Sequence, residues 1–280
     1  MSFRRASTIG LLSLWAGIAC SADPSPKNWQ YATESNVAYY ADARDAYQQE
    51  RCKLDVYYPK EVKGYPTVVW FHGGGLTGGD RYIPGLLKQR GIAIVGVSYR
   101  LAPKAQTPSF IEDAAASVAW VFKNIERYGG DPKQVFIAGH SAGAYLGMMI
   151  AMDPKWLAAH GLSHRQLAGV VAISGQMSTH PTIRKLRDDK SPRLRPVIDE
   201  YAPLFHVSKE LVPICMVVGG RDIEIEARVE ENQLMEATLR NLGHTAVEFH
   251  EMSGLDHGLV EQGGLVLVPA FIKRSLQTKP

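Results

Sequence analysis

Net charge, cysteine and long apolar segments are all scarce in this 280-residue chain. The formal net charge is +3 and falls to +1 without residues 1–22, which carry two arginines and no acid, so the charge gives no reason to expect a nucleic-acid partner. No segment resembles a repeat, a coiled coil or a low-complexity tract. With 45% hydrophobic and 21% charged residues, the composition is that of a globular domain with ample material for a core.

The one apolar run near the N-terminus is too short to cross a membrane. It covers residues 9–18, whereas a spanning helix needs roughly 20 residues. Two arginines precede it and small residues follow it, so we expect residues 1–22 to be a signal peptide and residues 23–280 to be the exported, mature domain. Lipid attachment at Cys20 and a buried N-terminal helix are the alternatives.

Two cysteines remain in the mature chain, and both lie in segments that we expect to be strands. These are Cys52 and Cys215. Export would permit a disulfide. Because the two strands are expected toward opposite ends of one sheet, the cysteines are too far apart to bridge. We therefore expect two free, structural thiols.

Apolar, β-rich runs alternate with amphipathic helical runs, a pattern typical of helices that cover both faces of a mostly parallel sheet. The expected strands are at residues 37–40, 52–58, 67–71, 92–97, 135–138, 169–173, 212–218 and 246–250. The expected helices are one that Thr107 caps and Gly129 ends, and others at residues 141–152, 224–242 and 258–276, the last with a break near Pro269. Residues 176–211 are rich in proline, arginine and aspartate and have no clean period, so we interpret them as an insertion over one face that forms a small lid.

Residues 139–143 read Gly-His-Ser-Ala-Gly and match the pattern G-x-S-x-G. The pattern alone is weak, because glycines are common in this chain. Its context is more specific: a strand ends just before it and a helical run begins just after it, as in a nucleophile elbow. Such a turn needs glycine at Gly139 and Gly143 and lifts the hydroxyl of Ser141 clear of the backbone. We expect Ser141 to be a nucleophile rather than part of a structural turn.

Serine attack on a carbonyl creates an oxyanion, which needs fixed N–H donors. Residues 72–75 read His-Gly-Gly-Gly and follow an expected strand, the type of loop that supplies such donors. We assign the backbone N–H groups of Gly74, Gly75 and Ala142 to this oxyanion hole. His72 is expected to order the loop rather than to perform chemistry.

The same loop also matches the dinucleotide-binding pattern G-x-G-x-x-G at residues 73–78. That fingerprint requires a helix that starts within the motif and an acid at the end of the next strand. Here residues 79–85 keep breaking a helix, and the next strand ends in Ser-Tyr-Arg, where only Arg100 would argue for a phosphorylated cofactor. A dehydrogenase is therefore the alternative that we set aside, and we expect no cofactor and no metal.

An acid and then a histidine follow the serine along the chain in hydrolases with this elbow. His257 lies in a polar loop after the last expected strand and is the candidate base. Its rivals are His244 and His250, at the two ends of that strand. Asp222 follows a buried strand, at the carboxyl end where the sites of open α/β sheets gather, and is the candidate acid. The fallback choices are Glu224 and Glu226.

In order and spacing, these motifs resemble α/β-hydrolase esterases near the hormone-sensitive-lipase-like group, and most of all bacterial carbohydrate esterases that act on acetyl and feruloyl esters. The resemblance runs from about Cys52 to the C-terminus. The motifs that carry it are residues 72–75, 128–132 and 139–143 and the pair Asp222 and His257. It implies the α/β-hydrolase fold, with a mostly parallel sheet of about eight strands, and a metal-free ester hydrolase that acts through an acyl-enzyme.

We therefore expect an exported serine esterase that hydrolyses short-acyl or feruloyl esters, with carbohydrate esters among its substrates. The short stretch at residues 23–49 cannot supply the large N-terminal cap of the hormone-sensitive-lipase-like enzymes, and an open site suits short acyl groups on a bulky alcohol. The expected partner is a small-molecule or carbohydrate ester, with no nucleic acid and no membrane span. The alternatives are an amidase, formamidase or peptidase of the same fold, and an inactive binding domain.

Overall fold

The computed structural model describes residues 28–192 and 194–277. The expected signal peptide and its lipidation alternative at Cys20 lie outside these residues. No described helix combines the length and apolar composition that a membrane span needs.

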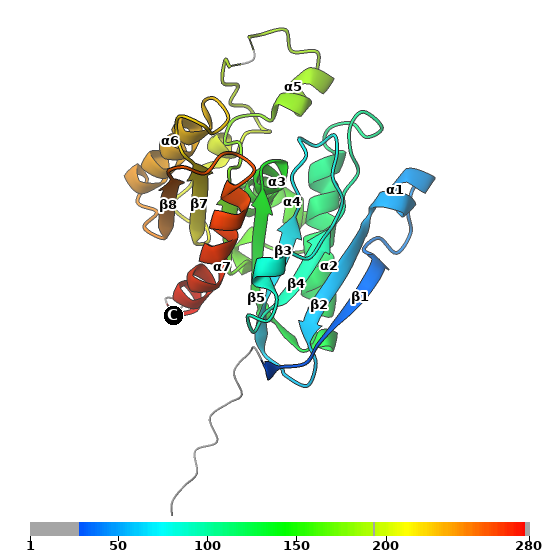
Figure 1. Ribbon diagram of the computed structural model, residues 1–280. Helices are drawn as coiled ribbons and strands as arrows, with labels where there is room; N and C mark the ends of the chain where they lie inside the picture. The colour runs from blue at the N-terminus through cyan, green and yellow to red at the C-terminus, as the bar shows by residue number, and fades with distance from the viewer. Residues whose placement is uncertain (1–27, 193, 278–280) are drawn as a thin grey trace, which may run out of the picture.

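Eight strands form one sheet, which confirms the expected fold (Figure 1). They are β1 (Tyr31–Ala38), β2 (Lys53–Pro59), β3 (Tyr65–Phe71), β4 (Ala93–Val97), β5 (Gly130–His140), β6 (Gly169–Ile173), β7 (Ile214–Gly219) and β8 (Val247–Met252). Their order is β1-β2-β4-β3-β5-β6-β7-β8. The pairs β1/β2 and β2/β4 are antiparallel and the others are parallel. This is the sheet of an α/β-hydrolase, and its parallel strands bring their carboxyl ends to one edge.

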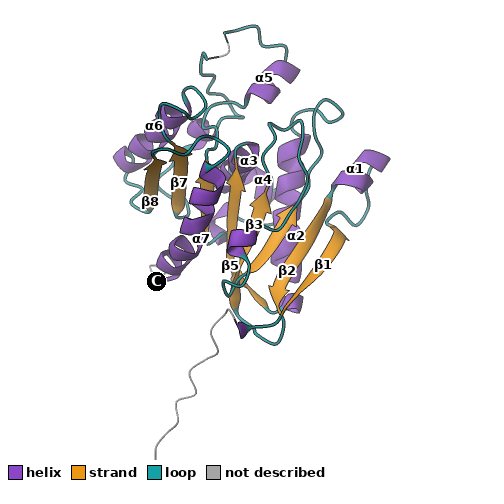
Figure 2. Cartoon of the chain, viewed as in Figure 1, coloured by secondary structure: helices purple, strands orange, loops and turns teal. Residues whose placement is uncertain are grey.

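Helices cover both faces of the sheet (Figure 2). The long ones are α2 (Ser109–Tyr128), α3 (Ala142–Met152), α6 (Arg228–Asn241) and α7 (Val260–Gln277). The short ones are α1 (Ala46–Arg51), α4 (Pro154–Ala158) and α5 (Pro181–Leu186), with 3₁₀ turns at Gly85–Leu87, His164–Gln166 and Pro203–His206. Apolar residues of α2, α3 and α6 pack in one core, and those of α7 pack in another.

Alternation along β3 shows why its sequence is continuously apolar. Val69 and Phe71 point into the core formed with α2 and α3, whereas Val68 and Trp70 point into the core formed with α7. All four are fully buried, and burying such a side chain contributes about 1.5–3 kcal/mol. Both faces of the strand therefore need apolar residues, as expected for a parallel sheet with helices on each side.

Two expected helix features are wrong in detail. Thr107 does not cap α2: Pro108 precedes the helix without a side-chain cap, and Thr107 Oγ1 is buried without a partner among the described residues. The expected break near Pro269 does not occur either: α7 continues through this residue. Proline removes one backbone hydrogen bond, but Val268 and Phe271 beside it are buried in the core and hold the helix on the sheet.

The segment at residues 176–211 carries α5, which lies beyond the carboxyl ends of the central strands (Figure 1), and the 3₁₀ turn at Pro203–His206, which packs against α3. Several hydrogen bonds join this segment to the domain, including three from Met177 and Ser178 to the Glu231 carboxylate of α6. Thr182 Oγ1 donates to the Gly75 carbonyl at 2.5 Å, and Tyr145 Oη donates to the Tyr201 carbonyl at 2.6 Å. The segment thus contacts the glycine loop expected to form the oxyanion hole. Its motion as a lid stays a prediction.

The two cysteines of the described chain are both buried and free. Cys52 directly precedes β2 and Cys215 lies in β7, five positions apart in the strand order. At about 4.8 Å per strand this is about 24 Å, whereas a disulfide needs Cα atoms within about 7 Å. The expected placement at opposite ends of the sheet is therefore correct.

Candidate active site

Ser141 occupies a sharp turn between β5 and α3. Its backbone has φ 54° and ψ −119°, and its N–H donates to the Ile173 carbonyl at 2.8 Å. A Cβ on Gly143 would lie 2.1 Å from the Phe71 carbonyl oxygen, and one on Gly139 would lie 2.5 Å from the Gly143 backbone. Only glycine fits at both positions, so the strand and helix can approach closely enough to hold Ser141 in this strained conformation.

His257 lies beside this serine, in the loop between β8 and α7. Its Nε2 is 2.9 Å from Ser141 Oγ, although the two residues are 116 positions apart in the sequence. The rival histidines lie elsewhere: His244 is bonded to the Lys209 carbonyl and His250 to Glu248. The structure therefore brings together the serine and the histidine that the sequence singled out.

The acid at His257 is Glu224, and the choice of Asp222 is wrong. Glu224 Oε1 is 2.7 Å from His257 Nδ1. Asp222 is exposed and makes no hydrogen bond with the described residues, and Glu226 is exposed as well. The reason is local: the N–H groups of Ile223 and Glu224 both donate to the Gly220 carbonyl, and this turn directs Glu224 back toward the sheet.

Glu224 is only a fallback choice in the sequence analysis because its segment is expected to begin a helix. Helix α6 starts four residues later, at Arg228, and residues 224–227 form a bend followed by a turn. The sequence offers no signal for the correct choice: Asp222, Glu224 and Glu226 alternate with Ile223 and Ile225, and of these five residues only Glu224 is buried.

The carboxylate of Glu224 is fully buried and well satisfied. Besides His257 Nδ1, it accepts hydrogen bonds from the Gly219 N–H at 2.9 Å, the Ile225 N–H at 2.8 Å and Ser174 Oγ at 2.8 Å. Burial opposes ionisation, but these donors outweigh it and lower the pKa of Glu224 to about 2. The carboxylate is therefore ionised at neutral pH and accepts a hydrogen bond from Nδ1–H of His257.

His140 supports the loop that carries His257. Its Nε2 is 2.7 Å from the His257 carbonyl, and its Nδ1 is 3.4 Å from Glu261 Oε2. Burial, reinforced by the charge of His257, lowers the pKa of His140 to about 4, so its ring is neutral near pH 7. A neutral ring with its proton on Nε2 donates to the His257 carbonyl and fixes the height of the loop above Ser141.

The glycine loop at residues 73–75 lies next to the serine. A Cβ on Gly73 would be 3.4 Å from the Cβ of Ser141. Gly74 and Gly75 have φ of 103° and 63°, and their N–H groups donate to no atom of the described chain. Ala142 is the first residue of α3, where helical N–H groups lack intrahelical partners. Gly73 thus borders Ser141, Gly74 and Gly75 continue its loop and Ala142 follows Ser141 directly, and the role of the three expected oxyanion donors stays a prediction.

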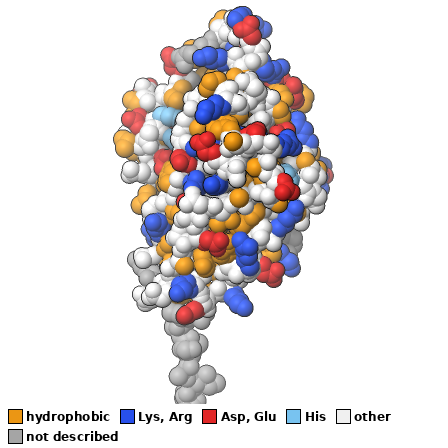
Figure 3. All heavy atoms as spheres, turned by 90° about the vertical axis from the view of Figure 1, so that its right-hand side faces the viewer, with side chains coloured by type: hydrophobic (Ala, Val, Ile, Leu, Met, Phe, Trp, Pro, Cys, Tyr) orange, Lys and Arg blue, Asp and Glu red, His pale blue; other side chains and the backbone are white. Residues whose placement is uncertain are grey.

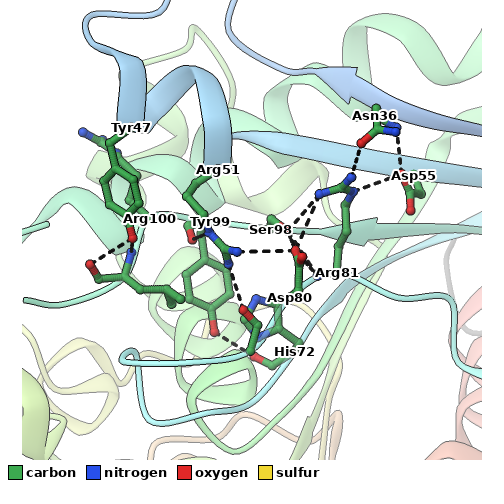
Figure 4. Close-up of polar contacts among 12 residues, drawn as sticks. Asn36, Tyr47, Arg51, Asp55, His72, Asp80, Arg81, Ser98, Tyr99 and Arg100 are labelled. Carbon is green, nitrogen blue, oxygen red and sulfur yellow. Dashed lines mark hydrogen bonds and ion pairs between the residues drawn. The ribbon is translucent and has the colours of Figure 1, made fainter. Parts of the chain in front are cut away.

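His72 anchors the start of this loop. Its ring stacks on Tyr99, with centroids 4.4 Å apart, and its Nδ1 is 2.7 Å from the Gly73 carbonyl. Burial is the main cause that lowers the pKa of His72 to about 4, so the ring is neutral. Tyr99 Oη donates to the His72 carbonyl at 2.8 Å (Figure 4). These contacts hold the backbone just before the glycines.

A polar network fixes the other end of the loop (Figure 4). Arg51 Nη2 donates to the Gly79 carbonyl at 2.9 Å, and Asp80 accepts from Ser98 Oγ. Arg81 Nε donates to Asp55 Oδ1 at 3.0 Å. Because these partners come from α1, β2 and the end of β4, the rigid sheet positions both ends of the glycine loop.

Neither a dinucleotide nor a metal is favoured at this site. No helix starts within residues 73–78, and Arg100 is committed to Asp113, at 2.7 and 2.8 Å. Among the described residues, one group has the side chains and spacing to hold an ion: Cys215, Glu248 and His250, at the β7–β8 edge. Arg274 donates to both oxygens of Glu248 there, so the charge of this carboxylate is already paired with a guanidinium.

Comparisons with known proteins agree with the fold. The BD-FAE family model matches residues 54–237. Esterase LipC of Mycobacterium tuberculosis is 28% identical over 232 residues, which are 73% of this chain and 56% of LipC. The probable carboxylic ester hydrolase LipM of the same organism is 25% identical over 91% of this chain and 64% of its own length. The chain thus spans less than two thirds of these relatives.

Solved structures extend the likeness in fold. A truncated carbohydrate esterase from gut microbiota superposes with a TM-score of 0.74 at 18% identity, over 91% of this chain and 99% of that one. Esterase B from Lactobacillus rhamnosis gives a TM-score of 0.69 at 21% identity, over 88% of each chain. At these identities the likeness concerns the arrangement of the backbone.

Proposed function

The chain belongs to the BD-FAE family, and on this premise we propose that it is a serine-dependent carboxylic ester hydrolase. The observation that carries the proposal is the unbroken series of contacts from Ser141 through His257 to the buried Glu224. In this order the imidazole acts as a general base that activates the serine hydroxyl, and the carboxylate stabilises the imidazolium that forms. The intact series also argues against an inactive binding domain.

The first half of the reaction forms an acyl-enzyme. His257 Nε2 accepts the hydroxyl proton of Ser141 while Oγ attacks the ester carbonyl carbon, and Glu224 stabilises the imidazolium through Nδ1–H. The N–H groups of Gly74, Gly75 and Ala142 donate to the oxyanion of the tetrahedral intermediate. As that intermediate collapses, the alcohol leaves with the proton from Nε2, and the acyl group stays on Ser141.

The second half repeats these steps with water. His257 takes a proton from the water as its oxygen attacks the acyl carbon, and the same donors hold the second oxyanion. Collapse returns the proton to Ser141 Oγ and releases the carboxylic acid. The serine and histidine end in their starting protonation states, so the cycle needs no cofactor and no metal.

Short-acyl or feruloyl esters, on carbohydrate alcohols, are the substrates we propose. We propose that the segment at residues 176–211, whose one α-helix is the six-residue α5, is a small cover that leaves room for a bulky alcohol. Apolar Ile223 and Ile225 are exposed on either side of Glu224, and we propose that they offer an apolar surface to the acyl group. The fold shared with the gut carbohydrate esterase supports the same substrate class.

We propose action outside the cytoplasm, as the N-terminal pattern predicts. On the face drawn in Figure 3, acidic and basic side chains are interspersed.

The test is hydrolysis of p-nitrophenyl esters, from acetate to decanoate, by the wild type and Ser141→Ala. We expect activity that falls with acyl length and is lost in Ser141→Ala while the circular dichroism spectrum is unchanged. Acetylated and feruloylated sugars then test the alcohol. Hydrolysis of anilides but of no ester would favour an amidase or peptidase, and inactivity on both substrates by folded wild type would refute the proposal.

A further inference from the structure

Ser174 is a fully buried serine next to the acid and the histidine, at the point where β6 ends. Its Oγ is 2.8 Å from Glu224 Oε2 and 2.9 Å from His257 Nδ1. The mechanism above assigns it no step. A hydroxyl that touches two members of the triad nevertheless influences where their protons lie.

The chain holds Ser174 in a conformation that it would not adopt freely. Its φ is 50°, in the left-handed region that non-glycine residues rarely occupy. Its N–H donates to the Val217 carbonyl at 2.6 Å, and its own carbonyl accepts from Arg228 Nη1. Asn232, one helical turn further along α6, donates to the Gly175 carbonyl at 2.9 Å. Two buried side chains of α6 therefore clamp the end of β6, and such supported strain is characteristic of functional sites.

The available donors and acceptors determine the direction of each hydrogen bond at Ser174. An ionised carboxylate only accepts, so the single hydroxyl proton of Ser174 goes to Glu224 Oε2. Arg228 Nη1 is 3.4 Å from Ser174 Oγ and, as a donor, also turns the hydroxyl proton away from itself. The lone pairs of Ser174 Oγ then face His257 Nδ1, which must carry a proton to bond them.

We propose that Ser174 is a positioning residue of the triad, whose hydroxyl orients the Glu224 carboxylate and keeps the proton of His257 on Nδ1. This leaves Nε2 with a lone pair toward Ser141, the tautomer that a general base needs. Ser174 touches neither substrate nor reacting atoms and acts through Glu224 and His257. The inference rests on the proposed function, since it concerns the reactivity of Ser141.

The test measures the rate at which a fluorophosphonate probe labels Ser141, because that rate reports the activation of the serine independently of the natural substrate. Ser174→Ala and Ser174→Gly both remove the hydroxyl, but glycine accepts a φ of 50° without strain. We expect both variants to be labelled about tenfold more slowly than wild type, the effect of one buried hydrogen bond. On an ester substrate, we expect kcat of both Ser174 variants to fall by the same factor as the labelling rate, with KM unchanged.

The matched control is Ser117→Ala, which removes another fully buried serine whose Oγ donates to the Ala114 carbonyl within α2. We expect it to be labelled at the wild-type rate. Wild-type labelling rates in both Ser174 variants would overturn the inference, as would a loss confined to Ser174→Ala, which would indicate a backbone effect. Absence of labelling in wild type would instead refute the proposed function itself.

Discussion

The assignment of the acid to Glu224 gives the sharpest test of the site, because the sequence favoured Asp222. In Glu224→Gln the amide must replace a carboxylate whose two oxygens both accept. Oε1 accepts from His257 and the Ile225 N–H, and Oε2 accepts from Ser174 and the Gly219 N–H. Whichever position the new NH₂ takes, it faces a backbone N–H donor, so the variant loses hydrogen bonds as well as charge.

The expected loss follows from the role of the carboxylate. Without its charge, the imidazolium formed during attack is unsupported, and an amide NH₂ toward Nδ1 favours the tautomer with the proton on Nε2. Removing the acid of a serine triad in this way lowers kcat by roughly 10⁴, or about 5 kcal/mol of transition-state stabilisation at 1.36 kcal/mol per tenfold. Asp222→Asn alters an exposed, unbonded side chain, and we expect it to stay within about twofold of wild type.

The assay is kcat on p-nitrophenyl acetate at pH 7 to 8, with thermal unfolding to confirm that each variant is folded. A folded Glu224→Gln that keeps more than about a tenth of wild-type kcat contradicts this reasoning, given the magnitude expected for a triad acid. So does an Asp222→Asn variant that loses as much activity as Glu224→Gln.

Three further predictions concern stability and the segments around the site. Because folding lowers the pKa of Glu224 to about 2 from 4.5, its contribution to stability is complete above the unfolded value and is lost as the pH falls through about 2. Chemical denaturation from pH 6 to 2 should therefore show a steeper loss of unfolding free energy in wild type than in Glu224→Gln, and parallel curves would contradict the lowered pKa. Thr182→Val removes the hydrogen bond to the Gly75 carbonyl. We expect kcat/KM to fall about fivefold with little change in Tm. An unchanged kcat/KM would show that this contact does not position the glycine loop. Gly143→Ala places a Cβ 2.1 Å from the Phe71 carbonyl oxygen of β3 and should prevent stable folding. Gly161 has a φ of 73° and open space around it, so Gly161→Ala should lower the free energy of unfolding, measured with denaturant, by only about 1 kcal/mol. Equal losses of stability in the two variants would refute the packing argument.

The fold, Ser141 and His257 could each be predicted from the sequence, for separate physical reasons. Strands covered on both faces must be continuously apolar, so the central strands could be located from composition along the chain, whereas β1, with an exposed middle at Tyr31–Ala38, was expected only at residues 37–40. The nucleophile elbow depends on glycines that contact backbone atoms, a requirement that leaves a mark in adjacent residues. His257 was identified by its polar loop after the last strand. Each of these features is local in sequence, even though the site it forms is not.

The acid could not be located in this way, because the choice depends on how a turn curls between β7 and α6. Asp222 and Glu224 are both acidic, both follow a buried strand, and only the two N–H groups that bond the Gly220 carbonyl decide which faces inward. Contacts distant in sequence hold that turn: Ser174, just after β6, donates a hydrogen bond to Glu224, and Arg228 donates to the Ser174 carbonyl. A residue whose orientation depends on three separate segments leaves no local pattern. The acid and its serine neighbour are therefore the members of the site that only the folded chain reveals.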